Sequence, residues 1–174
     1  DDEMLGEWQE LVYDSCTLCG RCSMVCPVGN DIALMIRKTR EGMAAAGQAP
    51  AGLIGATTRS VEIGSPMGVT WKALSAQIRH VEEDTGLKIP VDVEDVEYML
   101  LLSSMEIMNF PEFIEAVAKI FEKAGVTWTI SSEAFEATNS GIQIGVSDIA
   151  AVLVQRIVDV ADKLKVKTVI SPEC

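Results

Sequence analysis

The spacing of apolar residues changes near residue 96 and divides the chain into two parts. In the first part they recur every three or four positions, as on one face of a helix: Ile32, Met35 and Ile36, and later Trp71, Leu74, Ile78 and Val81. We therefore predict helices over about 30–47 and 70–85, with a shorter, weakly patterned helix over 50–63. Asn30 or Asp31 is suited to cap the first helix, because both side chains accept hydrogen bonds from free N–H groups.

The second part alternates apolar runs with helical patterns. Short apolar runs at 98–102, 126–131 and 166–170 are typical of buried parallel strands. Between them we predict two helices, one from Pro111 to Gly125 and one capped by Ser147. This β-α-β-α-β order predicts a parallel sheet with right-handed crossovers. The acidic stretch 91–95 marks the join, so the expected domains are 1–90, all-helical, and 91–174, α/β.

Four cysteines lie within eleven residues of the helical part. The run reads C-T-L-C-G-R-C-S-M-V-C-P and contains Cys16, Cys19, Cys22 and Cys26. This is the bacterial-type iron–sulfur pattern, in which proline follows the fourth cysteine. Thiolates are soft ligands that suit iron–sulfur clusters, and Gly20 lets the backbone turn closely around one. The sequence therefore predicts a [4Fe–4S] cluster on these four residues.

Two other interpretations of the cysteines fit less well. A disulfide framework is typical of small secreted domains, whereas this chain has 174 residues, five cysteines and no signal peptide. A zinc site more often has two C-x-x-C pairs separated by a longer loop. One alternative stays open. In two-cluster proteins the fourth cysteine ligates the other cluster, so Cys26 either completes the same cluster or serves a second one.

The chain carries a net charge of −12, from 26 acidic and 14 basic residues. Nucleic acid is not expected as a partner, because no basic patch could neutralise phosphates, whereas a basic surface on a redox partner is compatible. We predict that Arg37, Lys38 and Arg40 form a solvated helix face; offsetting a cluster's negative charge is the alternative. No apolar run is long enough to span a membrane, and the cysteine usage suits the reducing cytoplasm, where we expect the chain.

The carboxyl edge of the predicted sheet is a second candidate site, because sites in open parallel sheets lie beyond the carboxyl ends of the strands. Cys174 follows the third predicted strand by four residues and is expected at this edge. The segments 103–109 and 132–146, which follow the other two strands, should lie beside it. Loops as long as 132–146 are more often functional than idle. The expected position of Cys174 at the same edge makes it a candidate catalytic or metal-ligating residue. A lone, unreactive thiol is the alternative.

Four runs of the sequence carry a family resemblance: CTLCGRCSMVCPVGNDIA, SSMEIMNFPE, FEATNSG and VISPEC. With them, nearly the whole chain resembles the heterodisulfide-reductase-like iron–sulfur proteins. That family includes the catalytic subunit of methanogen heterodisulfide reductase and the iron–sulfur subunit of anaerobic glycerol-3-phosphate dehydrogenase. The runs look most like a third branch, the DsrK-type subunit of the membrane complex tied to dissimilatory sulfite reduction.

The resemblance implies an α+α/β fold, in which a helical ferredoxin-like iron–sulfur module precedes a β-α-β-α-β parallel-sheet half-domain. It also implies a further [4Fe–4S] site at Cys174, completed by residues outside this sequence, where thiol or disulfide chemistry occurs. The chain departs from the family at Ala137-Thr138-Asn139, where Cys-Cys-Gly is expected, and it lacks the family's upstream cysteine quartet. We therefore expect it to be a portion of a longer protein.

Two functions follow from these observations. The first is an oxidoreductase subunit that passes electrons through the cluster to or from a disulfide or thiol substrate near Cys174, in sulfur or anaerobic respiratory metabolism. The second is a non-catalytic electron relay, for example serving a quinone-linked dehydrogenase. Both imply other redox subunits as partners, among them a quinone-linked membrane subunit that would tie the chain to a membrane. A cluster-based sensor is a third interpretation.

Overall fold

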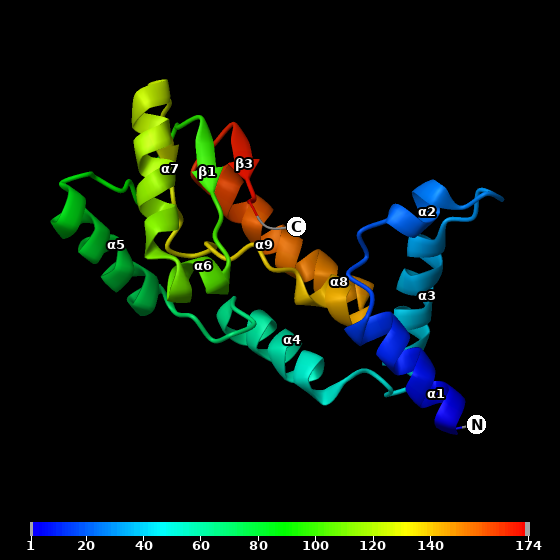
Figure 1. Cartoon of the computed structure of the whole chain (residues 1–174). Coiled ribbons are helices and arrows are strands. Elements are labelled where there is room, and N and C mark those ends of the chain that lie inside the picture. Colours follow the sequence, from blue (N-terminus) through cyan, green and yellow to red (C-terminus); the bar gives the residue numbers. More distant parts are fainter. Residues whose placement is uncertain (1, 173–174) are drawn as a thin grey trace. The chain divides into compact units, whose positions relative to one another are not determined.

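A computed structural model describes residues 2–172, whose helices and strands are shown in Figure 1. In chain order they are α1 (Asp2–Gln9), the π-helical η1 (Glu10–Asp14), α2 (Arg21–Val25), α3 (Ile32–Ala45), α4 (Ala51–Ile63), α5 (Trp71–Thr85), β1 (Tyr98–Leu100), α6 (Ser104–Asn109), α7 (Pro111–Ala124), β2 (Trp128–Thr129), α8 (Ser140–Ile144), α9 (Ser147–Lys163) and β3 (Thr168–Ile170). None of the helices in this described part is long and apolar enough to cross a membrane.

The helices predicted from apolar spacing are confirmed as α3, α4, α5, α7 and α9. Asp31 caps α3, because its carboxylate accepts a hydrogen bond of 3.0 Å from the Leu34 N–H. Gly125 ends α7 with a φ of 66°, a conformation that glycine adopts without strain. Ser147 differs from the prediction. It is the first residue of α9, and its hydroxyl donates to Glu41 at 3.2 Å.

The predicted parallel β-α-β-α-β sheet is confirmed, with strand order β2-β1-β3. Tyr98 of β1 lies opposite Trp128 on one side and Thr168 on the other. The strands are shorter than the apolar runs predicted, since β2 has only two residues. Isolated bridges, Val91 to Ile130 and Leu102 to Glu136, continue the pairing beyond the regular ladder.

Alternate residues of the central segment face opposite sides of the sheet, as the pleat requires. Leu100 and Leu102 pack with residues of α5 and α7 in one apolar cluster. Met99 and Leu101 pack with Val160 and Ala161 of α9, and with Leu164 just after it, in another. Helices α5 and α7 therefore cover one face of the sheet and the end of α9 covers the other.

The chain forms two compact units. The first contains the described residues up to 58 together with 139–151, and the second contains 59–138 and 152–172. This grouping differs from the division at residue 90 that we expected, because α5 packs on α6 and α7 rather than with the cysteine loop. The first unit has its own apolar core, made by Val12, Tyr13, Met43, Ala49 and Ile144.

The predicted loop 132–146 is wrong as a single loop. Its first half, up to residue 138, stays at the sheet in the second unit, whereas its second half forms α8 and belongs to the first unit. Helix α8 packs against α3, and Ile144 joins the core of the first unit. Segment 132–146 thus serves two places in the fold, which its length and glycines alone did not indicate.

Candidate iron–sulfur site

The four predicted ligands lie on one continuous surface segment of the first unit. Cys16 follows η1, Cys22 lies within α2, and Cys26 is the residue that ends α2. Cys16 and Cys26 are half-buried, while Cys19 and Cys22 are exposed, and all four are free thiols. The sulfurs are thus on a loop that other molecules can approach.

Two left-handed residues, one on each side of Cys19, shape the turn around that cysteine. Leu18 has a φ of 57°, and Gly20, which caps α2, has a φ of 77°. The Gly20 carbonyl accepts hydrogen bonds from Ser23 N (3.1 Å) and Met24 N (3.2 Å), which starts the short helix. The role predicted for Gly20, a close backbone turn within the cysteine run, is confirmed.

A side-chain bridge ties α2 to the start of α3. The Ser23 hydroxyl donates to Asp31 Oδ1 at 2.9 Å and accepts from Ala33 N at 2.9 Å. Hydrogen bonds from Leu34 N and Ser23 hold the pKa of Asp31 below its usual value. The loop carrying Cys22 and Cys26 is therefore anchored at both ends of its turn.

Hydrogen-bond donors lie beside the sulfurs of Cys16, Cys19 and Cys26. Leu18 N donates to Cys16 Sγ and Asn30 N to Cys26 Sγ, each at 3.4 Å. The backbone N–H of Arg21 and the hydroxyl of Thr17 lower the pKa of Cys19. Such donors favour the thiolate, which is the form that binds metal.

This donor set fits a [4Fe–4S] cluster, which takes one cysteine thiolate on each of its irons. Within residues 2–172, no three His, Cys, Asp or Glu side chains meet closely enough to hold a single metal ion. A [4Fe–4S] cluster binds one thiolate on each iron, so its four sulfurs surround the cluster at a wider spacing than the ligands of a single ion. N–H groups that donate to the sulfurs also help to set a cluster's reduction potential.

Arg40 lies under the cysteine loop and is only 4% exposed. It donates from Nε to the Val12 carbonyl at 2.6 Å, from Nη2 to the Cys16 carbonyl at 2.6 Å and from Nη1 to the Gln143 carbonyl at 3.1 Å. Burial lowers the pKa of Arg40, and the ionised forms of Cys16 and Tyr13 counteract this. The prediction that Arg40 belongs to a solvated face is wrong, because three carbonyls draw its side chain inward; Arg37 and Lys38 are exposed.

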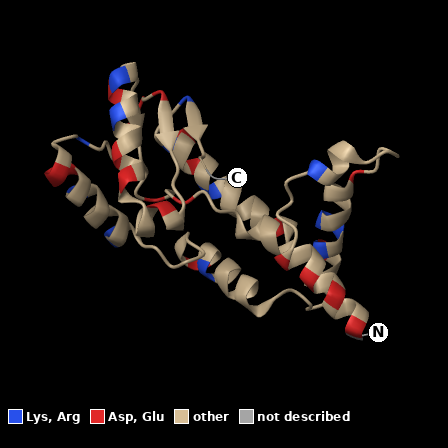
Figure 2. Ribbon diagram, in the orientation of Figure 1, with Lys and Arg blue, Asp and Glu red and all other residues tan. Residues whose placement is uncertain are grey.

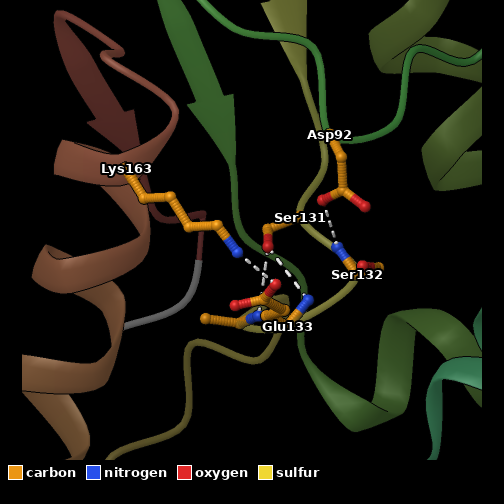
Figure 3. A network of polar contacts seen from close by, with 6 residues as sticks. Asp92, Ser131, Ser132, Glu133 and Lys163 are labelled. Atoms are coloured by element: carbon orange, nitrogen blue, oxygen red, sulfur yellow. Dashed lines mark hydrogen bonds and ion pairs between the residues drawn. The ribbon is translucent and has the colours of Figure 1, made fainter.

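The carboxyl edge of the sheet, the second candidate site, carries a polar network (Figure 3). Ser131 Oγ accepts from Glu133 N at 3.0 Å, and Ser132 N donates to Asp92 Oδ1 at 2.8 Å. Lys163 forms an ion pair with Glu133, which raises the pKa of Lys163. Both side chains of that pair are more than half exposed, so the pair contributes little to stability. Cys174, predicted at this edge, lies outside the described residues.

A buried carboxylate close to this edge was missed from the sequence. Glu136 accepts from Ser104 N (2.9 Å), Ser104 Oγ (2.7 Å) and Thr138 Oγ1 (2.8 Å), and Ser65 contacts Ser104 at 2.9 Å. Burial raises the pKa of Glu136, although these hydrogen bonds oppose the shift. No local pattern reveals Glu136, because its main partner, Ser104, is 32 positions away.

By contrast, Glu106 forms a capping box with Ser103, which the S-x-x-E spacing of the sequence could have indicated.

Comparison with known proteins gives one finding. A family model described as a 4Fe-4S binding domain matches residues 10–30, a stretch that contains all four cysteines. No curated protein and no solved structure matches the chain. The match indicates a [4Fe–4S] cluster and supports a role in iron–sulfur electron transfer.

Proposed function

We propose that the chain transfers electrons through one [4Fe–4S] cluster held by Cys16, Cys19, Cys22 and Cys26. The observation that carries this is the single loop of four free cysteines, with N–H donors to its sulfurs, inside the segment that matches a 4Fe-4S binding domain. When bound, such a cluster takes up and releases one electron at a time. The protein's part is to supply thiolates and hold the loop in shape.

The partner in this transfer is another redox protein. Exposed apolar side chains flank the exposed cysteines: Met24 is 86% exposed, Val25 78% and Val28 75%. Arg21 and Arg37 lie exposed on α2 and α3, whereas α1 of the same unit is acidic (Figure 2). Residues 15–30 carry a single charged side chain, Arg21, so the exposed apolar side chains dominate the surface that the cysteine loop offers to a partner.

Metal analysis tests the cluster directly. Protein prepared without oxygen should contain about four iron and four sulfide per chain, with the visible absorption of an iron–sulfur cluster. Cys19→Ser should lose most of both, since serine supplies no thiolate. Met24→Ser is the matched control, because it changes an exposed neighbour on the same loop and should keep both. Zinc in place of iron and sulfide in the unaltered protein would contradict the proposal.

The finer proposal is that the chain belongs to a heterodisulfide-reductase-like oxidoreductase and acts on a disulfide or thiol beside Cys174. Its support is the resemblance of the VISPEC run and the position of β3, which leads the chain to the carboxyl edge of the sheet. Reduction would break one S–S bond and form two thiols, consuming two protons and two electrons. Those electrons would arrive singly from a low-potential carrier protein, and a quinone-linked membrane subunit is the alternative redox partner.

A pure relay is the second candidate function. It is favoured by the cysteine content of the described chain, because residues 2–172 hold no cysteine beyond the four of the loop. Cys174 separates the two functions. In the intact complex, Cys174→Ala should abolish disulfide-coupled turnover but leave electron transfer to an artificial acceptor unchanged. Full disulfide-coupled turnover in this variant would exclude the catalytic role of Cys174 and leave electron relay as the function of the chain.

A further inference from the structure

Arg40 is a buried charge without a charged partner. Its guanidinium bonds three main-chain carbonyls, and none of the ion pairs formed among residues 2–172 includes it. The adjacent carboxylate of Glu41 is engaged by Lys38 and Ser147. A buried cation is costly unless a negative charge compensates it. The Tyr13 ring, whose centroid lies 5.4 Å from the guanidinium carbon, offers a cation–π attraction but no negative charge, so the Arg40 cation still lacks a counter-charge.

The charge is also fixed in place. The Arg40 carbonyl accepts the Tyr13 hydroxyl at 3.1 Å, and that hydroxyl is also 3.0 Å from the Ile144 carbonyl. Gly145 presses against Arg40, since a Cβ added there would lie 2.6 Å from the Arg40 carbonyl carbon. Arg37 and Lys38 on the same helix are exposed and screened by water and salt. Among these three cations, only Arg40 is held at a set position in a low-dielectric environment.

The negative charge that would balance Arg40 is the cluster. Four thiolates give a [4Fe–4S] centre a net negative charge, and one of the three carbonyls bound by Arg40 is that of the ligand Cys16. We propose that Arg40 is the internal counter-ion of the cluster and the positioning residue for Cys16. Its fixed charge favours the reduced, more negative state and so raises the reduction potential. This inference rests on the proposed [4Fe–4S] cluster.

Two substitutions of Arg40 separate its charge from its hydrogen bonds. Arg40→Lys keeps the charge but not the three-way fork, whereas Arg40→Gln keeps an N–H donor and removes the charge. Arg156→Gln is the matched control, because Arg156 also donates to two main-chain carbonyls, of Ser60 (3.0 Å) and Val61 (2.7 Å), but lies in the second unit. Iron content and midpoint potential are measured for each anaerobically prepared variant.

If Arg40 is a counter-ion, Arg40→Gln should lower the midpoint potential. The potential of Arg40→Lys should stay close to that of the unaltered protein, and the potential of Arg156→Gln should equal it. If Arg40→Gln fails to retain iron, Arg40→Lys should still retain it. Equal iron loss in both Arg40 variants, or equal potentials in Arg40→Gln and the unaltered protein, would overturn the counter-ion role. Unaltered protein without iron and sulfide would refute the proposed function instead, so the two failures are distinguishable.

Discussion

At the scale of single residues, the two ends of the cysteine loop are built alike. Cys16 and Cys26 are both half-buried, and each sulfur accepts one main-chain N–H at 3.4 Å. This similarity favours one cluster that uses all four cysteines over a fourth cysteine reserved for another cluster. The question left open by the spacing can therefore be tested by substitution.

We expect Cys26→Ser to lose the cluster as completely as Cys16→Ser, because each removes one of four required thiolates. Iron and sulfide contents of the two purified variants check this. Ser15→Ala, beside Cys16, is the control and should retain both. If Cys26→Ser keeps its cluster while Cys16→Ser does not, Cys26 serves a second cluster and a ligand from elsewhere completes the first.

Glu136 gives the fold a pH dependence with a definite sign. Burial raises its pKa in the folded state, so the folded protein binds the proton more tightly than the unfolded chain. The stability that this group contributes is full below the ordinary carboxyl pKa and is lost as pH rises through the raised value. Glu136→Gln should remove this part of the pH dependence, because the amide does not titrate.

Urea unfolding of both proteins between pH 4 and 8 measures the difference. Relative to the unaltered protein, Glu136→Gln should become more stable as pH rises. Glu133→Gln, which changes an exposed carboxylate on the same segment, should show no such trend. A difference that stays constant with pH would mean that the three hydrogen bonds to Glu136 fully offset its burial.

Arg40 and Glu136 also show what sequence could not predict at this scale. The cysteines were found because their spacing is local and carries the chemistry itself. Arg40 looked like a surface residue, and its burial depends on carbonyls 24 to 103 positions away along the chain. Residues whose roles depend on long-range packing leave no local pattern.

At the scale of elements, the long helices were predictable and the short ones were not. Helices α3, α5 and α7 carry apolar faces over three or more turns and end at glycines or near them. Helix α8 has only five residues and depends on its neighbours. Gly141 lies within this helix and Gly145 ends it, and each has backbone atoms of other segments within 3 Å of an added Cβ. Packing of this kind cannot be inferred from periodicity.

Gly145→Ala should therefore destabilise the first unit by about 3 kcal/mol. Gly145 has a φ of 90°, and an added methyl group would lie 2.6 to 2.7 Å from Arg40 and Glu41. Gly42→Ala in α3 is the control. Nothing lies within 4 Å of its Cβ position, so it should stabilise the helix by about 0.5–1 kcal/mol. Chemical denaturation of each variant tests the pair, and equal effects would contradict the packing of α8 on α3.

At the scale of the whole molecule, the two compact units have different sources of stability. The second unit has apolar clusters on both faces of its sheet, with Met99, Leu102, Ile114 and Ile130 fully buried. The first unit has a small core of five buried apolar residues, and its cysteine loop is largely exposed. The sequence predicted a helical part and an α/β part but not the division between the units. Helix α5 belongs to the second unit and segment 139–151 to the first, and both assignments depend on tertiary packing.

This contrast predicts an uneven response to loss of the cluster. Metal binding contributes directly to the folding free energy of small metal-dependent modules, so removal of iron should loosen the first unit. Amide hydrogen exchange should increase at residues 10–45 and 140–146, where the loop, Arg40 and α8 are joined by hydrogen bonds. Exchange at 99–102, 114–118 and 128–130 should stay unchanged, because those amides lie in or beside a core that contains no predicted ligand. Equal acceleration in both sets would show that the units unfold together, and none in the first would show that its core suffices without metal.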